Sequence, residues 1–254
     1  WGTPEDLKTF EYWEKSYQNH NRFLGLSRPS VAQVLMPMAG LGSRFTGITD
    51  IPKPFIPVSG SPMYRRALET LPKAQTTVLV TLDAVKSFLT DHQEKLVFLK
   101  ETPRGQALST EAGISSLALS EEVLVSSCDH GIVLAPSVWE KFKKNPDCDA
   151  AIFTIRGYPG ANSRPEAYAY VVTDNQGEFP EVKKVSVKVP VSNTPMNDSL
   201  LVGTFWFKSA DVLSQGIKEL KKREVLVNGE LYLDSVFEIL KEKGAKVREI
   251  PLSG

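Results

Sequence analysis

A glycine turn with basic residues close behind it is the first stretch of the sequence that could do chemistry. The apolar run from Val31 ends in a Gly-Leu-Gly-Ser-Arg turn at residues 40–44, and Lys53 follows between two prolines. Glycines let the backbone take a positive φ and let a polyanion approach the main-chain N–H groups without a Cβ in the way. A guanidinium and a lysine add charge suited to phosphate. The stretch predicts a phosphate-binding loop at the end of a buried strand.

Two common phosphate loops do not fit this spacing. The dinucleotide fingerprint requires a third glycine or alanine where Phe45 stands. The Walker loop requires Gly-Lys-Ser/Thr, whereas Gly42 is followed by Ser43 and Arg44. A different class of phosphate loop is therefore expected.

A second chemical position is Asp129, which follows an apolar run at residues 123–127. An acid at the end of a buried parallel strand suits Mg²⁺, which takes one or two carboxylates together with phosphate oxygens. The neighbouring His130 has no second His or Cys at zinc spacing, so a zinc site is not expected. Cys128 is expected to be a packed residue, because no His-Asn constellation supports a nucleophile.

The strands and helices that position these residues are predicted by a regular alternation of strand and helix patterns along the sequence. We expect strands near residues 76–82, 96–100 and 123–127, and helices near residues 61–71, 85–91 and 106–119. Such alternation predicts βαβ units, that is, a three-layer αβα, Rossmann-like, mostly parallel sheet. Ligands of such sheets bind at the carboxyl ends of the strands, where the glycine loop and Asp129 both fall.

Composition excludes several classes of partner. Hydrophobic residues make up 41% and charged residues 24%, as in an ordinary globular protein, and 30 basic residues balance 30 acidic ones. This balance argues against nucleic-acid or anionic-membrane binding. We find no apolar run of the roughly 20 residues that a membrane span needs and no signal-peptide pattern. Two cysteines make no disulfide framework, so a cytoplasmic location is expected.

The motif Gly-x-Gly-Ser-Arg-Phe followed by Pro-Lys-Pro at residues 52–54 resembles the signature of the sugar-phosphate nucleotidyltransferases, also called nucleotide-sugar pyrophosphorylases. The Pro-Met-Ala-Gly-Leu-Gly-Ser-Arg-Phe opening is most similar to their capsule-polysaccharide branch. The loop is about one residue shorter than the usual family spacing. The resemblance implies a GT-A-type fold, catalytic roles for Arg44 and Lys53, and nucleotide binding through Ala39, Gly40, Gly42, Ser43, Arg44 and Gln106.

Later matches to the family are shorter. Asp129 matches the first metal-holding aspartate, and Asp234, near the start of a helix, fits the second, so the resemblance implies Mg²⁺ on this pair. Considered separately, each aspartate could equally well be a helix cap as a metal ligand. Gln106 follows a glycine-containing turn and carries a donor and an acceptor that could read a base edge, and a plain helix-capping loop explains it equally well.

Residues from about 156 to 207 resemble the family's antiparallel sugar-binding insertion. An Asp-Asn-Gln-Gly turn at residues 174–177 is typical of antiparallel strands. The sugar-phosphate-binding positions implied are Lys188, Gly203, Trp206 and Tyr168, although a core strand explains Trp206 as well. Val187 replaces the glutamate that many members use to bind sugar hydroxyls, which leaves the identity of the sugar open.

The first 30 residues resemble the segment that closes the family's chain. Thr3-Pro4-Glu5-Asp6 is a good helix start, and Leu7, Phe10, Trp13 and Tyr17 share a face that is expected to dock on the body. A circular permutation, a domain cut from a longer chain and a helix that closes a neighbouring copy all fit. The expected organisation is a helical segment at 1–30 and a nucleotidyltransferase domain at 31–254, with Trp1 close to Gly254 if the segment closes its own domain.

The resemblance implies an Mg²⁺-dependent nucleotidyltransferase. It would join a nucleoside triphosphate and a sugar 1-phosphate, or a similar phosphorylated metabolite, and release pyrophosphate. The substrates are the expected partners, with neither nucleic acid nor membrane, and a homo-oligomer is left open. Two alternatives remain: a metal-dependent glycosyltransferase of related fold, and a non-catalytic paralogue that senses nucleotides or nucleotide sugars.

Overall fold

The computed structural model describes residues 3–24, 26–45, 47–90, 92–144 and 147–252, without the side chains of Glu5, Phe23, Leu24 and Arg44. Strands and helices alternate along this chain. The helices are α1 (Pro4–Leu24), α2 (Met63–Thr70), α3 (Gln106–Ile114), α4 (Pro136–Lys143), α5 (Gly160–Ser163), α6 (Ala210–Lys222) and α7 (Val236–Glu242). The strands are β1 (Ser30–Pro37), β2 (Pro57–Val58), β3 (Ser61–Pro62), β4 (Lys73–Leu82), β5 (Lys95–Leu99), β6 (Val123–Ser126), β7 (Ala150–Ile155), β8 (Ala169–Thr173), β9 (Val182–Val187), β10 (Ser199–Phe207) and β11 (Val247–Pro251). Short 3₁₀ helices are η1 (Ser43–Phe45), η2 (Lys53–Phe55), η3 (Asp83–Phe88), η4 (Pro165–Ala167), η5 (Pro195–Asn197) and η6 (Leu233–Ser235).

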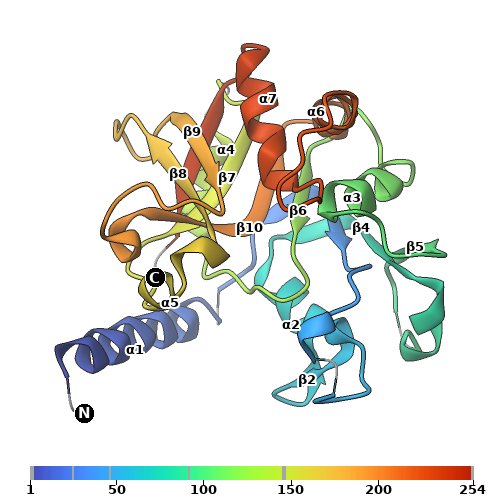
Figure 1. Cartoon of the computed structure of the whole chain (residues 1–254), viewed down its shortest axis with the longest axis horizontal. Coiled ribbons are helices and arrows are strands. Elements are labelled where there is room, and N and C mark those ends of the chain that lie inside the picture. Colours follow the sequence, from blue (N-terminus) through green and yellow to red (C-terminus); the bar gives the residue numbers. More distant parts are fainter. Residues whose placement is uncertain (1–2, 25, 46, 91, 145–146, 253–254) are drawn as a thin grey trace.

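A mixed, mostly parallel sheet forms the centre of the molecule. In the described chain it has nine strands, ordered β11-β7-β10-β6-β1-β4-β5, with β8 paired to β10 and β9 paired to β8. β1 pairs in parallel with β4 on one side and β6 on the other. β10 runs antiparallel to both β6 and β7. The predicted fold class is confirmed, and the carboxyl ends of β1 and β6 lie at the same edge of the sheet (Figure 1).

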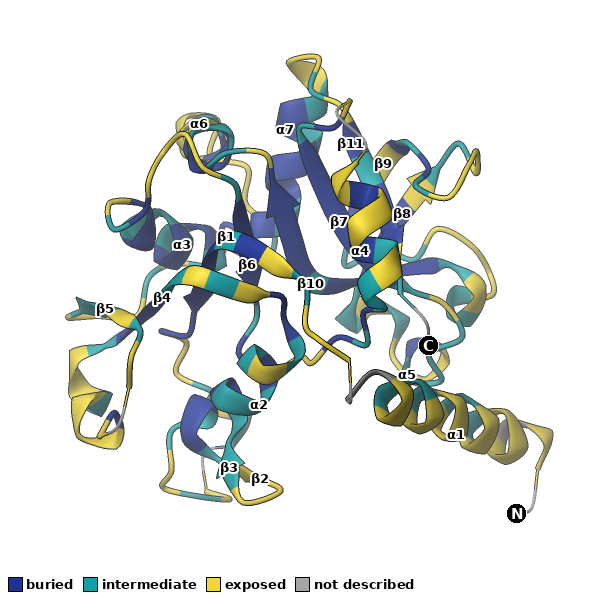
Figure 2. Cartoon of the chain, turned by 180° about the vertical axis from the view of Figure 1, so that it is seen from behind, coloured by how far each residue is buried: buried dark blue, intermediate teal, exposed yellow. Residues whose placement is uncertain are grey.

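Helices cover both faces of this sheet. Leu35 of β1 packs in the core formed with α3, α6 and α7, whereas Val34 and Met36 pack in the core formed with α2 and α4. Successive side chains of a strand point to opposite faces, so a strand covered on both sides is an unbroken apolar run. The central strands β6, β7 and β10 are accordingly buried, whereas β5 at the edge is only partly buried and the helices are exposed on their outer sides (Figure 2).

Two elements differ from the sequence-based expectation. The short helix expected at 85–91 is the 3₁₀ helix η3, and Asp91 lies outside the described residues. The helix expected at 106–119 ends at Ile114. Hydrogen bonds to side chains hold the following turn, because Gln33 accepts from Ala118 N at 2.7 Å and donates to Ala118 O at 3.0 Å. The buried Gln33 amide replaces the helical hydrogen bonds that the last turn would have made.

The long helix predicted at the N-terminus is present as α1, but the predicted docking face is only partly in contact with the body. Leu7, Phe10, Trp13 and Tyr17 are 52%, 42%, 44% and 66% exposed. α1 contacts the body through Tyr12 and through Trp13 of the predicted face, whose rings lie 5.8 Å and 6.2 Å from that of Tyr158. None of the described helices, the 21-residue α1 included, combines the length and hydropathy needed to cross a bilayer.

The domain boundaries expected around this helix stay a prediction. The proposed closeness of Trp1 and Gly254 concerns two residues outside the described ones.

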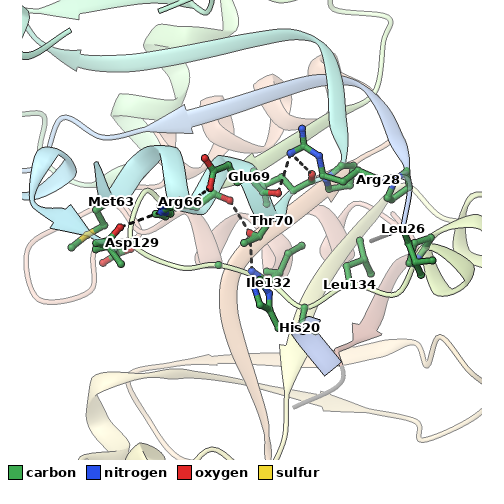
Figure 3. A pocket seen from close by; sticks show the side chains of 18 residues that line it. His20, Leu26, Arg28, Met63, Arg66, Glu69, Thr70, Asp129, Ile132 and Leu134 are labelled. Atoms are coloured by element: carbon green, nitrogen blue, oxygen red, sulfur yellow. Dashed lines mark hydrogen bonds and ion pairs between the residues drawn. The ribbon is translucent and has the colours of Figure 1, made fainter. Parts of the chain in front are cut away.

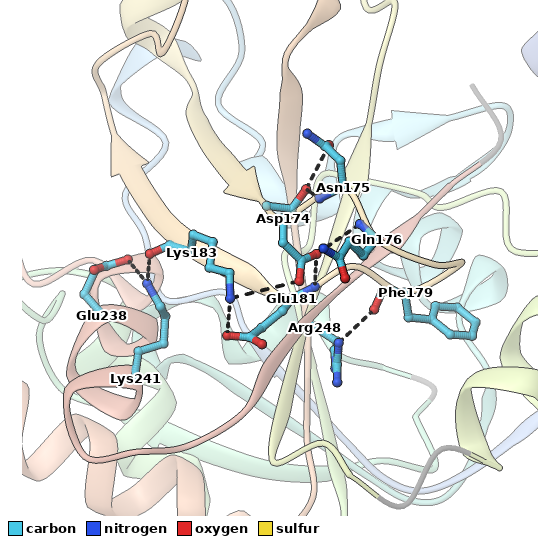
Figure 4. Close-up of polar contacts among 10 residues, drawn as sticks. Asp174, Asn175, Gln176, Phe179, Glu181, Lys183, Glu238, Lys241 and Arg248 are labelled. Carbon is cyan, nitrogen blue, oxygen red and sulfur yellow. Dashed lines mark hydrogen bonds and ion pairs between the residues drawn. The ribbon is translucent and has the colours of Figure 1, made fainter.

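The predicted antiparallel insertion is present as the β8–β9 pair. Asp174 at the end of β8 accepts hydrogen bonds from Gln176 N at 3.1 Å and Glu181 N at 3.0 Å, which holds the connecting loop (Figure 4). These bonds lower the pKa of the Asp174 carboxyl. Lys241 of α7 donates to Lys183 O, so the insertion is also attached to the last helix.

Candidate active site

The predicted phosphate loop leaves the end of β1 and passes directly against Lys53. Gly42 has φ +63°, and a Cβ there would lie 2.7 Å from Lys53 Cβ. Phe45 N donates to Gly42 O at 2.8 Å, which closes the turn η1. A residue with a side chain at position 42 would be strained and would also push Lys53 aside. The loop therefore depends on glycine for its shape and for its contact with the lysine.

The other predicted loop residues differ in what they can offer a ligand. Ala39 is only 1% exposed, whereas Gly40 and Ser43 are exposed. A Cβ at Gly40 would meet nothing within 4 Å, so its backbone is open to a ligand. Arg44 belongs to η1, but its side chain lies outside the described ones.

Lys53 and Asp129, 76 residues apart in sequence, form an ion pair in which Lys53 Nζ donates to Asp129 Oδ2. Lys53 begins η2 between Pro52 and Pro54, and the prolines fix φ on both sides of it. Phe55 anchors this turn, since its ring lies 5.6 Å from that of Tyr64 in α2. About a quarter of each charged side chain is exposed, 28% for Lys53 and 25% for Asp129, so a ligand can reach the pair.

The other oxygen of Asp129 is held from its own chain segment. Ser127 Oγ donates to Asp129 Oδ1 at 2.7 Å, and His130 Nδ1 lies 2.9 Å from the same oxygen. Burial alone would raise the pKa of Asp129, but hydrogen bonds and charge from His130 and Lys53 hold it well below its ordinary range. Asp129 is therefore a carboxylate throughout the neutral pH range.

Cys128 is a packed residue, as the sequence predicted. Its side chain is buried, and burial together with the charge of Asp129 raises the pKa of the thiol to about 12. A thiol with so high a pKa is no nucleophile at neutral pH.

Gly203 of β10 lies beside this group, and Trp206 does not. Ser127 N donates to Gly203 O at 3.0 Å, and a Cβ at Gly203, where φ is +81°, would lie 3.6 Å from Ser127 Oγ. Trp206 is 7% exposed, donates from Nε1 to Glu122 Oε2 at 2.6 Å and meets the Phe142 ring edge-on at 5.0 Å. Of its two interpretations, the structure therefore supports core packing.

A second group gathers around Lys188 at the end of β9. Lys188 has φ +62°, an uncommon conformation for a residue with a side chain. Its N donates to Tyr168 O at 3.1 Å, its Nζ donates to Ala167 O, and its Nζ lies 5.7 Å from the centre of the Tyr232 ring. The predicted acceptor-side residues Lys188 and Tyr168 are thus neighbours.

Asp234 in η6 lies near Lys188. Burial raises the pKa of the half-buried Asp234 carboxyl to about 6, and the positive charge of Lys188 opposes this rise. A carboxyl that titrates close to neutrality is unusual, and such groups occur more often in functional sites.

The turn before α3, which carries Gln106, is joined to the segment that leads to Asp234. Leu231 accepts from Ala107 N at 3.1 Å and donates to Arg104 O at 3.1 Å. Gly105 has φ +110°, and a Cβ there would lie 2.4 Å from Leu231 O, so only glycine permits this contact. Gln106 is the first, half-buried residue of α3.

The predicted site residues therefore form two groups. One contains the Gly42 loop, Lys53, Asp129 and Gly203, and the other contains Gln106, Lys188, Tyr168 and Asp234. Among the described residues no contact joins Asp129 to Asp234, and only the former lines the large cavity described below. Their joint role in metal binding stays a prediction.

The donor chemistry suits Mg²⁺ held jointly with substrate phosphates. Within the described part of the chain, no three His, Cys, Asp or Glu side chains gather into a metal site. Mg²⁺ needs only one or two protein carboxylates when phosphates supply other ligands. The ionised Asp129 meets that requirement, and Asp234 does so once it loses its proton.

Ser127 was not among the residues predicted from the sequence. Residues i and i+2 at the end of a strand point the same way, so a hydroxyl two residues before Asp129 was a usable signal. Tyr232 was not predicted either, and the one sequence signal for it was its position two residues before Asp234.

Comparison with known families decides the class of protein. Residues 34–195 match the model of the MobA-like NTP transferase domain. The chain belongs to this family. None of the curated proteins matches it at a significant level of sequence similarity.

Solved structures agree with this NTP transferase in fold. The nucleoside-diphosphate-sugar pyrophosphorylase of Vibrio cholerae RC9 has a TM-score of 0.66 at 17% identity and covers 86% of this chain and 91% of its own. The inositol-1-phosphate CTP transferase of T. maritima has a TM-score of 0.67 at 17% identity, with 89% and 87% covered. A UDP-glucose pyrophosphorylase complexed with UDP-glucose has a TM-score of 0.67 at 17% identity, with 88% and 91% covered. At such identity the similarity establishes the fold alone.

Proposed function

We propose that this NTP transferase joins a nucleoside triphosphate to a sugar 1-phosphate, or to a similar phosphorylated metabolite, and releases pyrophosphate. The observation that carries the proposal is the Lys53–Asp129 ion pair packed against the Gly42 loop. It places a cation, an anion and accessible backbone N–H groups at the carboxyl edge of the sheet, where α/β proteins bind ligands. Solved pyrophosphorylases and a CTP transferase of the same fold support this class of substrate.

The proposed reaction mainly requires the negative charges of the two substrates to be neutralised. An oxygen of the acceptor phosphate forms a bond to the α-phosphorus, and the bond to the pyrophosphate oxygen breaks with its electron pair. Two polyanions have to meet, so neutralisation and alignment contribute more than proton transfer. We assign the leaving pyrophosphate to the N–H groups of the Gly40–Gly42 turn and to Arg44, and the α-phosphate to Lys53.

The second group would serve the other parts of the substrates. Lys188 would bind the attacking phosphate, with Tyr168 and, from the first group, Gly203 along the acceptor, and Gln106 would bind the base. Mg²⁺ on Asp129 and Asp234 would neutralise charge on the reacting phosphates. Before substrate arrives, the Lys53–Asp129 pair keeps both charges in place, and binding of phosphate and Mg²⁺ would replace their mutual contact.

The sequence resemblance to the capsule branch supports a role in supplying activated precursors for polysaccharide synthesis, and we propose that role and a cytoplasmic location. The cysteines Cys128 and Cys148 are both buried free thiols, which agrees with a reducing compartment.

Pyrophosphate release from a matrix of nucleoside triphosphates and phosphorylated acceptors, including sugar 1-phosphates and inositol 1-phosphate, tests the proposal. Release should require one member of each class and Mg²⁺. Lys53→Met should abolish it, whereas Lys86→Met, at an exposed lysine of η3, should leave it unchanged. Nucleotide binding without pyrophosphate release would support a sensor, and sugar transfer from a nucleotide sugar would support a glycosyltransferase.

A further inference from the structure

A large cavity opens next to the candidate active site, on the side of α2. Its volume is about 810 Å³, within the range of about 300–1,000 Å³ that is usual for small-molecule sites. It lies between α2, the loop 131–136 that follows Asp129, and the segment 26–29 that joins α1 to β1 (Figure 3). Among the described residues assigned to the reaction, only Asp129 lines it.

The walls of the cavity are mainly apolar. They include Leu26, Met63, Ala67, Leu71, Ile132 and Leu134. Such walls do not suit the triphosphate and the phosphorylated acceptor of the proposed reaction, because these are highly charged. They suit a hydrocarbon or aromatic body, whose transfer from water contributes about 25 cal/mol per Å² of buried apolar surface.

One positive charge at the cavity lacks a carboxylate partner. Arg66 pairs with Glu69 at 2.8 Å, and Asp129 pairs with Lys53, so these charges are compensated. Arg28 has only carbonyl partners, because its Nη1 donates to Glu69 O at 3.0 Å and to two neighbouring carbonyl oxygens at the end of α2. In the described chain no ion pair involves Arg28, and its Nε and Nη2 have no hydrogen-bond partner. Carbonyl dipoles hold the guanidinium in place but leave most of its charge available to an anion.

We infer that this cavity is a second ligand site, which takes an apolar organic anion: a hydrocarbon or aromatic body with one carboxylate, sulfonate or phosphate group directed at Arg28. The apolar body would lie between α2 and the loop 131–136. The anionic group would lie at the end formed by Arg28 and His20, opposite Asp129.

Fluorescence titration with 8-anilinonaphthalene-1-sulfonate, an aromatic body with one sulfonate, tests the inference. N-phenyl-1-naphthylamine, its neutral counterpart, is the matched probe. The intact chain should bind the sulfonate saturably, with one site per chain, and more tightly than the neutral probe. Arg28→Gln should weaken binding of the sulfonate about fivefold to tenfold and leave binding of the neutral probe unchanged, since only the sulfonate uses the charge.

A pair of substitutions at the cavity mouth separates this site from the apolar face of α1. Leu26 lines the cavity and is 51% exposed, so Leu26→Asp should fold and should weaken binding of the sulfonate at least about tenfold. Leu26→Lys, which also removes the leucine, should weaken it much less. Leu7→Asp on α1, at a residue 52% exposed and outside the cavity, should have no effect.

Three results would overturn the inference. Loss of binding in Leu7→Asp with normal binding in Leu26→Asp would place the probe on α1. Equal effects of Arg28→Gln on both probes would remove the anion site. Complete displacement of the sulfonate by a nucleoside triphosphate would place it in the nucleotide site. None of these readouts uses nucleotidyl transfer, so failure of the proposed function and failure of this site are distinguishable.

Discussion

Asp234→Asn should make the protein more stable and less active at once. Burial raises the pKa of Asp234 from the ordinary 3.8 to about 6. Asp234 therefore loses its proton at lower pH in the unfolded chain than in the folded chain. As the pH rises from 3.8 to about 6, the unfolded state is increasingly favoured, and the free energy of unfolding falls. The full cost corresponds to about 3 kcal/mol, at 1.36 kcal/mol per pKa unit.

Asparagine removes this cost because it stays neutral. The gain in the free energy of unfolding should be near zero below pH 3.8, about 2 kcal/mol at pH 5 and about 3 kcal/mol at pH 8. Urea unfolding of the metal-free protein in EDTA at pH 5 and pH 8 measures it. Asp83→Asn, at an exposed aspartate of η3, is the matched control and should change stability by less than about 0.5 kcal/mol at both pH values.

Activity distinguishes a functional carboxylate from a merely tolerated one. If Asp234 binds Mg²⁺, Asp234→Asn should lower turnover at least about a hundredfold, the scale of losing one electrostatic stabiliser. Equal stability of the variant and the parent at pH 8 would refute the raised pKa. Increased stability with normal turnover would keep the pKa and remove Asp234 from the metal site.

Three further substitutions test separate parts of the site. Asp129→Ala should lower pyrophosphate release at least about a hundredfold, and near-normal release would remove Asp129 from the site. Gly42→Ala should lower turnover, because the added Cβ would displace Lys53. The control is Gly60→Ala, at a positive φ of +79° with no neighbour within 4 Å, which should lose only about 1 kcal/mol of stability to backbone strain and keep its turnover. Thermal unfolding measures the stability of both variants, and pyrophosphate release measures their turnover. Trp206→Phe should reduce the free energy of unfolding by about 1 kcal/mol through loss of the indole hydrogen bond and leave the KM for the acceptor unchanged, and a raised KM would return Trp206 to the acceptor site.

Sequence patterns were sufficient for the fold class and for the placement of the Gly42 loop and Asp129 at one edge of the sheet. β1 and β6 are short apolar runs that must be parallel neighbours or near neighbours, so their carboxyl ends, with the Gly42 loop and Asp129, fall at one edge. The ion pair of Lys53 with Asp129 was not predicted, because Lys53 lies in η2, well beyond the end of β1, and its position relative to Asp129 is set by the folded chain.

Other features depend on packing that the sequence does not encode locally. Leu7 and Tyr17 lie on the predicted apolar face of α1 and are more than half exposed, whereas Tyr12 and Trp13 make the contact, because the partner surface at Tyr158 is itself aromatic and is formed only in the folded chain. The raised pKa of Asp234 likewise arises from burial among residues distant in sequence, which no local pattern reports.

The backbone contact between Gly105 and Leu231 has a mechanical consequence. Three hydrogen bonds cross between residues 104–107 and 229–231: two join main chain to main chain, and in the third the side chain of Arg104 donates from Nε to Gly229 O at 2.6 Å. The start of α3 and the segment that leads to η6 are therefore fastened to each other directly, so Gln106 and Asp234, more than a hundred residues apart in sequence, are coupled by local main-chain contacts outside the sheet.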